Sequence, residues 1–418
     1  MKTYFYEYPN KVDNPNAGVE VRLKEEMTSD EIFLLEQAKL HDLAPIEAWT
    51  ALGTNNQINY STHGIFRYFG KFPSTIGAHL IMQYSKEGGN VMDPMGGSGT
   101  TALECLLSNR KCNSYDVNPL SVLLAKVKTS YIPKGKLEKE LNNIQERYKP
   151  LTIEEFEWIP EGIKNLDHWF LKETQDSIRG LIKLINEIED KDIRDFYTIC
   201  LASSIRTVSR ATSQQGRLFL DVLTAKEDCL ETFVKKAKKA IISISDLPIN
   251  NNTVNCVIHN ASEPFDNQEN DLIICHPPYF NSYKYSSVNS LELCWMKIDH
   301  ATVRKKEVRE FFKVGKAENV SRYVDDMKYV LSNISTTLKK DGVIGLMIGD
   351  TVIKGEYIPA TRLTIDEFLK ENQNIIVEKV VLRVPKYTEA SWTTSQRRKT
   401  DKVGITLNDF IIIFRRIN

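Results

Sequence analysis

Short apolar runs of strand length recur in two stretches of the chain, and a long stretch between them has none. In both stretches, segments with apolar residues at helical spacing stand between the runs, which predicts a mostly parallel α/β sheet. No helical segment stands between the last two runs, so that pair is predicted to form a C-terminal β-hairpin. The predicted strands are 90–93, 112–116, 254–258, 271–275, 343–349, 375–383 and 405–415.

The stretch without strands, residues 120–249, has apolar residues at helical spacing only, so it is predicted to be a helical insert. Residues 1–28, rich in Asn, Pro and charge, predict an irregular arm, and 1–60 as a whole would be an N-terminal arm and helix. The sheet domain would then comprise 61–119 and 250–418. Helices are predicted at 29–40, 74–85, 99–109, 135–149, 172–189, 191–212, 227–243, 321–339 and 363–371.

The composition excludes several classes of protein. Of 418 residues, 41% are hydrophobic and 26% are charged, which is typical of a globular chain with a sizeable core. The 55 Lys and Arg residues balance the 55 Asp and Glu residues, so a nucleic acid would have to bind local basic patches. The seven cysteines include no Cys-x-x-Cys pair, and no apolar run suits a secretory signal or a transmembrane helix. We therefore expect a cytoplasmic protein with reduced thiols, no metal and no membrane partner.

The most informative stretch is the glycine loop Asp93–Thr101, DPMGGSGTT, between a predicted strand and a predicted helix. Glycines allow the backbone to turn tightly and to approach a ligand closely, and a helix N-terminus attracts negative charge. No lysine follows the last glycine, so the loop is not a nucleotide-hydrolysing Walker A motif. Asp116 ends the next predicted strand, where a carboxylate would accept hydrogen bonds from ribose hydroxyls. The pattern predicts a cofactor site rather than a turn that serves only packing.

A second stretch, His276-Pro277-Pro278-Tyr279, follows the predicted strand 271–275. The two prolines fix the backbone of this corner. Taken alone, a Pro-Pro pair is more typical of an ordinary loop. The glycine loop upstream makes a catalytic corner the better interpretation.

Together the two stretches resemble the S-adenosylmethionine-dependent nucleic-acid amino-methyltransferases. DPMGGSGTT resembles their first motif, usually Asp-Pro-Phe-x-Gly-x-Gly-Thr-Thr, with Met95 in place of Phe. HPPY resembles their catalytic motif, in which Asp, Asn or Ser usually precedes Pro-Pro-Tyr/Phe/Trp. THGIFRYFGKFPSTIGAHLI resembles the segment that precedes the first motif. The resemblance covers 61–119 and 252–415, and it implies a Rossmann-like class I methyltransferase sheet with S-adenosyl-L-methionine as the cofactor.

The resemblance also implies roles for individual residues. The catalytic corner would be His276, Pro277, Pro278 and Tyr279. Asp116 would hold the ribose, and Asn260 would lie near the adenine at a position that is commonly acidic in the family. The residues that would bind the cofactor are Lys71, Phe72, Asp93, Pro94, Gly96, Gly97, Gly99, Thr100, Asp116 and Asn260.

An exocyclic amino group on a base is a poor nucleophile because its lone pair is delocalised into the ring. A side chain that accepts a hydrogen bond from the amino group helps the nitrogen to become tetrahedral, and an aromatic ring can stack on a flipped base. Neutral His276 can accept such a bond and an imidazolium cannot, so activity should fall at acid pH. In the family, Ser tends to go with cytosine N4, and Asp or Asn with adenine N6. Residues 280–283 resemble the cytosine-type enzymes, which favours cytosine N4 over adenine N6.

Locally basic segments are the candidates for contact with DNA. Arg206 and Arg210 stand four residues apart on a predicted helix and would share one face of it. The segment between the last two strands would sit beside the catalytic edge of the sheet. A third basic segment, 300–316, is explained equally well as a solvated surface. The predicted nucleic-acid-binding residues are Arg206, Arg210, Arg217, Trp392, Arg397, Arg398 and Lys399.

The leading prediction is a site-specific methyltransferase that acts on double-stranded DNA, within a restriction-modification system and beside a cognate restriction endonuclease. The insert 120–249 would be its DNA-recognition element. One alternative is an RNA methyltransferase that modifies guanine N2 or adenine N6. Another is a non-catalytic, cofactor-binding partner subunit in which His276 marks lost activity. A small-molecule methyltransferase would leave the arginine-rich segments without a role.

Overall fold

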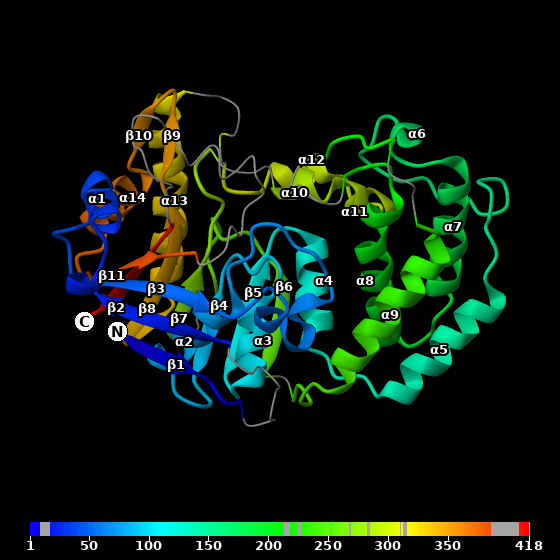
Figure 1. Cartoon of the computed structure of the whole chain (residues 1–418), viewed down its shortest axis with the longest axis horizontal. Coiled ribbons are helices and arrows are strands. Elements are labelled where there is room, and N and C mark those ends of the chain that lie inside the picture. Colours follow the sequence, from blue (N-terminus) through cyan, green and yellow to red (C-terminus); the bar gives the residue numbers. More distant parts are fainter. Residues whose placement is uncertain are drawn as a thin grey trace.

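The fold is built on one large sheet with helices on both faces (Figure 1). The structure is a computed structural model. It describes residues 1–8, 17–212, 218–223, 227–251, 253–266, 269–281, 285–309, 311, 316–385 and 409–417.

The order of the strands in the main sheet is β1-β2-β3-β11-β12-β8-β7-β4-β5-β6. The strands from β8 to β6 are all parallel, whereas β12 runs antiparallel to both of its neighbours, β8 and β11. This arrangement confirms the predicted mostly parallel α/β sheet with an antiparallel final strand. The strands are β1 (Lys2–Phe5), β2 (Gly18–Leu23), β3 (Ile46–Leu52), β4 (Asn90–Asp93), β5 (Lys111–Asp116), β6 (Val254–Ile258), β7 (Asn270–Cys275), β8 (Leu338–Gly349), β11 (Ile375–Arg383) and β12 (Asp409–Arg416), with a separate ribbon of β9 (Thr351–Ile353) and β10 (Glu356–Ile358).

The N-terminal region corrects one prediction. Residues 1–28 were expected to be irregular, but the described part contains β1 and β2, and β3 follows. These strands extend the sheet beyond β11, because β3 pairs in parallel with β11, where Ile46 lies opposite Val380. A short strand has little local signal of its own. Strand β3 is stabilised by β11, which lies more than three hundred positions further along the chain.

The central strands are buried on both faces. Along β7, Leu272 and Ile274 belong to one hydrophobic cluster, and Ile273 and Cys275 belong to another on the opposite face. Successive side chains of a strand point to opposite sides, so a continuous apolar run suits a sheet that is covered on both faces. The helices that cover it are α1 (Ser29–Gln37), α2 (Ser74–Tyr84), α3 (Thr100–Leu107), α4 (Pro119–Lys128), α13 (Val320–Ser335) and α14 (Ala360–Glu371).

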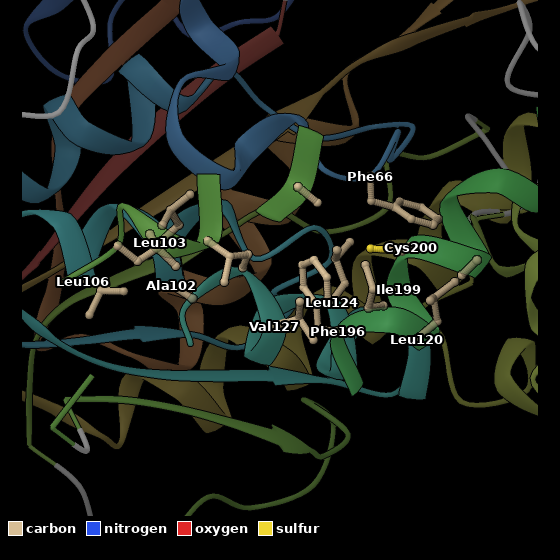
Figure 2. Close-up of a cluster of buried hydrophobic side chains, with 14 of the residues drawn as sticks. Phe66, Ala102, Leu103, Leu106, Leu120, Leu124, Val127, Phe196, Ile199 and Cys200 are labelled. Atoms are coloured by element: carbon tan, nitrogen blue, oxygen red, sulfur yellow. The ribbon is translucent and has the colours of Figure 1, made fainter. Parts of the chain in front are cut away.

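The region after β5 is helical, as predicted. Its helices are α5 (Lys134–Arg147), α6 (Leu166–Trp169), α7 (Lys172–Asn186), α8 (Lys191–Val208) and α9 (Cys229–Ser245). Helix α4, which the sequence reading missed, lies against β5 and β6. Figure 2 shows Phe196 and Ile199 of α8 packed beside Leu120 and Leu124 of α4. The insert therefore shares a continuous hydrophobic core with the sheet.

Three short helices lie between β7 and α13 in the chain: α10 (Tyr285–Val288), α11 (Ser290–Trp295) and α12 (His300–Arg304). Figure 1 shows them along the top of the molecule, and α11 contacts α8. No helix in the described part of the chain combines the length and the apolar character needed to cross a bilayer.

Candidate active site

A cleft opens at the carboxyl ends of the parallel strands β4, β5, β6 and β7. Four loops meet there because parallel strands present their carboxyl ends at the same edge of a sheet. The empty space of the cleft, open mouth included, is about 750 Å³. Its lining includes nine of the predicted residues: Lys71, Phe72, Pro94, Gly96, Gly97, Asp116, Asn260, His276 and Pro278.

The glycine loop after β4 is held close to β5. The Gly96 N–H donates to the carbonyl of Tyr115 at 2.7 Å, and a Cβ on Gly96 would lie 2.2 Å from Ser114 Oγ. Gly99 has a φ of 72°, and a Cβ there would lie 2.7 Å from the Cα of Ala125 in α4. The loop therefore needs glycine at Gly96 for close approach and at Gly99 for both conformation and space.

Asp116 lies at the end of β5 and faces the cleft. Its carboxylate accepts hydrogen bonds from the N–H groups of Gly97 and Asn118, each at 2.8 Å. Burial raises the pKa of Asp116 to about 6, and these N–H donors act in the opposite direction. A carboxylate has more than two acceptor positions, so Asp116 can support the loop and still accept from a ligand hydroxyl.

Asp93 supports the loop from below. It is buried, and its Oδ1 accepts from the Met95 N–H at 3.1 Å. Burial raises the pKa of Asp93 to about 7. Gly99 and Thr100 are also buried, and the Thr100 hydroxyl is 2.9 Å from that of Ser98. These three predicted residues shape the loop beneath the cleft wall.

The segment that precedes α2 forms a further wall. The Lys71 ammonium donates to the His63 carbonyl at 3.2 Å and to the Asn59 side chain, and burial lowers its pKa to about 8. The Phe72 ring meets the His276 ring edge to face, with centroids 5.4 Å apart. The upstream segment and the His-Pro-Pro-Tyr corner are therefore in direct contact.

The His-Pro-Pro-Tyr corner follows β7 directly. His276 Nε2 is 3.0 Å from the Tyr279 hydroxyl, and the Tyr323 hydroxyl donates to the Pro278 carbonyl at 2.9 Å. Burial lowers the pKa of His276 to about 4, so its imidazole is neutral at neutral pH. Tyr279 itself is buried, and its ring packs at the end of β8. Pro277 is buried too.

Asn260 follows β6 and lines the cleft next to His259. Its side-chain oxygen accepts from the Ser262 N–H at 3.0 Å, which holds the turn. Asn260 therefore lies just beyond β6, the strand that pairs with β5, at whose end Asp116 lies.

One side of the cleft was not predicted as part of the site, although Lys306, Glu307 and Val308 lie in the basic segment 300–316. A Cβ on Gly70 would lie 2.6 Å from the Tyr285 ring, so the upstream segment touches the α10–α12 region. Glu307 accepts from both the N–H and the hydroxyl of Ser286 at 3.0 Å, which joins the two ends of that region. No motif marks these positions. The cleft residues that were not predicted are Tyr68, Gly70, Met95, Ser98, Val117, His259, Ala261, Tyr285, Lys306, Glu307 and Val308.

The predicted basic surface needs a correction at Arg206. The residue is buried, its guanidinium donates to the carbonyls of Thr212 at 3.1 Å and Val288 at 3.3 Å, and it stacks over Phe69 at 5.1 Å. The prediction that it faces DNA is therefore wrong. Helix α8 ends at Val208, so Arg210 lies beyond it and does not share a helix face with Arg206.

Arg210 is partly exposed and donates to the Asp167 carbonyl at 3.2 Å. It stays a candidate contact for nucleic acid. The other predicted residues lie outside the described part of the chain: Arg217, Trp392, Arg397, Arg398 and Lys399.

Arg206→Ala is expected to lower the free energy of unfolding by about 2 kcal/mol, because the carbonyls of Thr212 and Val288 lose a charged donor. The salt dependence of nucleic-acid binding should not change, since the guanidinium is buried within the protein. Thermal unfolding and binding at several salt concentrations would measure both effects, with Arg210→Ala as the matched variant. A reduced salt slope in the folded Arg206→Ala protein would restore the original prediction.

Comparison with known proteins gives this geometry a family context. Residues 13–127 match the family model described as DNA methylase. The Type II methyltransferase M.MvaI of Kocuria varians is 25% identical over 248 residues, which is 53% of this chain and 54% of that protein. The Type II methyltransferase M.BsoBI of Geobacillus stearothermophilus is 26% identical over 282 residues, covering 59% of this chain and 55% of that protein. The chain thus spans about half the length of these relatives.

Solved structures are more distant. TrmN from Thermus thermophilus aligns with 83% of this chain and 50% of its own at a TM-score of 0.32 and 9% identity. The rRNA methyltransferase aviRa from Streptomyces viridochromogenes aligns with 84% of this chain and 88% of its own, at a TM-score of 0.30 and 11% identity. Likenesses at this level do not bear on what the chain acts on. The sequence matches support the resemblance: residues 13–127 match a DNA methylase model, and more than half of the chain is similar to Type II methyltransferases.

Proposed function

We propose that this chain transfers a methyl group from S-adenosylmethionine to the exocyclic amino group of a base in DNA. The observation that carries the proposal is that the glycine loop, Asp116 and His276 all line one cleft. A cofactor-binding loop and a hydrogen-bond acceptor for an amino group are the two parts that such a transfer requires.

The residues of the cleft suit the cofactor. The glycine loop is packed closely against β5 and α4, since a Cβ on Gly96 or Gly99 would clash with Ser114 or Ala125. This packing leaves Gly96 and Gly97 in the lining of the cleft. Asp116 offers a carboxylate at the end of the neighbouring strand, where ribose hydroxyls would be recognised. Lys71, Phe72 and Asn260 would enclose the rest of the molecule. When bound, S-adenosylmethionine supplies an electrophilic methyl group on a sulfonium.

His276 is proposed to orient the target amino group by accepting a hydrogen bond from it. Its low pKa, about 4, keeps the imidazole in the neutral form that can accept. The same low pKa makes His276 a weak base at neutral pH, so we assign it orientation rather than removal of the proton. Tyr279 is proposed to present its ring to a base that has left the duplex, and its hydroxyl fixes His276.

Finer assignments rest on the sequence. The resemblance of residues 280–283 to cytosine-type enzymes favours cytosine N4 over adenine N6. The Type II names of the relatives favour double-stranded DNA and a restriction-modification system, with the insert as the reader of the DNA sequence. The location of His276 in the same cleft as the glycine loop supports catalysis over the non-catalytic alternative.

The test is mass spectrometry of nucleosides from DNA and from RNA, each incubated with the protein and methyl-labelled S-adenosylmethionine. Labelled N4-methylcytosine in DNA is the expected product. Labelled N6-methyladenine in DNA would support the proposed DNA amino-methyltransferase but with adenine, not cytosine, as the target base. Label in RNA alone would support the RNA alternative, and cofactor binding without any label would support the non-catalytic one.

A further inference from the structure

Tyr279 lies on a part of the sheet that the motifs do not mark. Gly349 ends β8, and a Cβ there would lie 2.9 Å and 3.0 Å from two ring carbons of Tyr279. Gly349 does not have a positive φ, so its backbone conformation does not call for glycine. What the position requires is the absence of a side chain, because the Tyr279 ring occupies that space.

Asp409 also lies next to the space that a Cβ on Gly349 would occupy. A Cβ on Gly349 would lie 3.1 Å from Asp409 Oδ1, and Asp409 is the cross-strand partner of Gly349. Asp409 in turn is the cross-strand partner of Arg383, and the guanidinium donates to its Oδ2. Both members of this ion pair are buried. A buried ion pair is weak support for stability but can fix a precise arrangement of groups.

Tyr279 links these residues to His276, the proposed hydrogen-bond acceptor for the target amino group. The Tyr279 hydroxyl lies 3.0 Å from His276 Nε2, so the place of the ring determines where the imidazole is held. We propose that Gly349, Asp409 and Arg383 form a seat that positions Tyr279 and, through its hydroxyl, His276 for methyl transfer. This inference rests on the proposed function and adds three positioning residues to it.

The charges of the seat also act on His276. The groups around the imidazole are Tyr279 on its own loop, Lys71 in the same cleft, and Asp409 and Arg383 on β12 and β11. After burial, which is the main cause of the low pKa of His276, Asp409 acts to raise it and Arg383 acts to lower it. The two charges act on the pKa of His276 in opposite directions, so removing one of them should shift this pKa.

The first experiment compares two glycines on one strand. Gly349→Ala should lower kcat by about tenfold to a hundredfold, because displacing the ring by a fraction of an ångström spoils the alignment. The dissociation constant of S-adenosylmethionine should stay within about threefold, since β8 carries no cofactor contact in the proposed site. Gly345→Ala is the matched control on β8, since its Cβ would meet Leu80 at 3.4 Å and touch no catalytic group. Equal kcat values in Gly349→Ala and Gly345→Ala would contradict the proposal that Gly349 positions Tyr279.

The second experiment needs no methyl transfer, so it separates failure of the seat from failure of the proposed function. The titration of His276 can be followed by NMR in histidine-labelled protein, with His276→Asn to identify the signal. Arg383→Met should raise the pKa of His276, and Asp409→Asn should lower it. An unchanged His276 titration in a folded Arg383→Met protein would contradict the proposal. If that variant does not fold, the comparison of Gly349 with Gly345 still decides.

Discussion

Replacing His276 with phenylalanine is expected to lower kcat by about a thousandfold, because the target amino group loses its hydrogen-bond acceptor. The ring shape is roughly preserved, so contacts with Phe72 should persist. The dissociation constant of S-adenosylmethionine should change by less than about threefold. Single-turnover methylation and calorimetric cofactor binding would measure the two quantities.

His276→Asn is the matched variant, because an amide oxygen can accept the same hydrogen bond and Asn is usual at this position in the family. It should keep far more activity than His276→Phe. Equal losses in the two variants would show that the acceptor is not what matters at this position.

The pH profile gives an independent check. The pKa of His276 is lowered to about 4, so the acceptor is neutral above that value and is lost as the pH falls through it. At saturating cofactor, kcat should therefore stay level down to about pH 5 and then fall. A fall centred near the ordinary histidine pKa would mean that His276 is more exposed to water in the working enzyme.

Asp116→Ala is expected to weaken S-adenosylmethionine binding by about a hundredfold, the loss of about 3 kcal/mol of charged hydrogen bonds. Asp116→Asn keeps an acceptor and should lose about tenfold. Calorimetry would give both constants. Binding of S-adenosylmethionine should also weaken below about pH 6. The pKa of Asp116 is raised to about 6, and its protonated form is a poorer hydrogen-bond acceptor.

Asp192→Ala is the control, because this exposed acid lies on α8 and pairs with Lys126. Thermal unfolding should accompany each binding measurement, since Asp116 also holds the Gly97 and Asn118 N–H groups. Wild-type affinity in a folded Asp116→Ala protein would leave Asp116 with a role in the loop alone.

Local pattern was sufficient for much of the fold. The strands β4 to β7 and the longer helices α3, α5, α7, α8, α9 and α13 were predicted close to their observed bounds, because apolar period and turn residues are local properties. A short apolar pattern was not sufficient to predict an element. The strands β1 to β3 and helix α4 were missed. Strand β3 joins the sheet through β11, far along the chain, and α4 packs against β6 and α8 as well as against the preceding β5.

Arg206 shows why charge in a sequence does not identify a surface. Its lack of acidic neighbours in sequence suggested a phosphate contact, but α8 directs it inward onto Phe69 and two carbonyls. Burial of an arginine depends on acceptors that other segments supply. Val288, one of these acceptors, lies 82 positions away from Arg206.

The sequence by itself determined the mostly parallel sheet, the glycine loop with Asp116, and the His-Pro-Pro-Tyr corner. Each of these depends on the order of neighbouring residues: apolar period, glycine at a tight turn, and proline at a corner. Only the tertiary structure decided that His276 is neutral, that Tyr279 sits over Gly349, and that the α10–α12 region closes the cleft. The physical reason is that desolvation and close packing are properties of a place in space, and segments far apart in the chain meet to create that place.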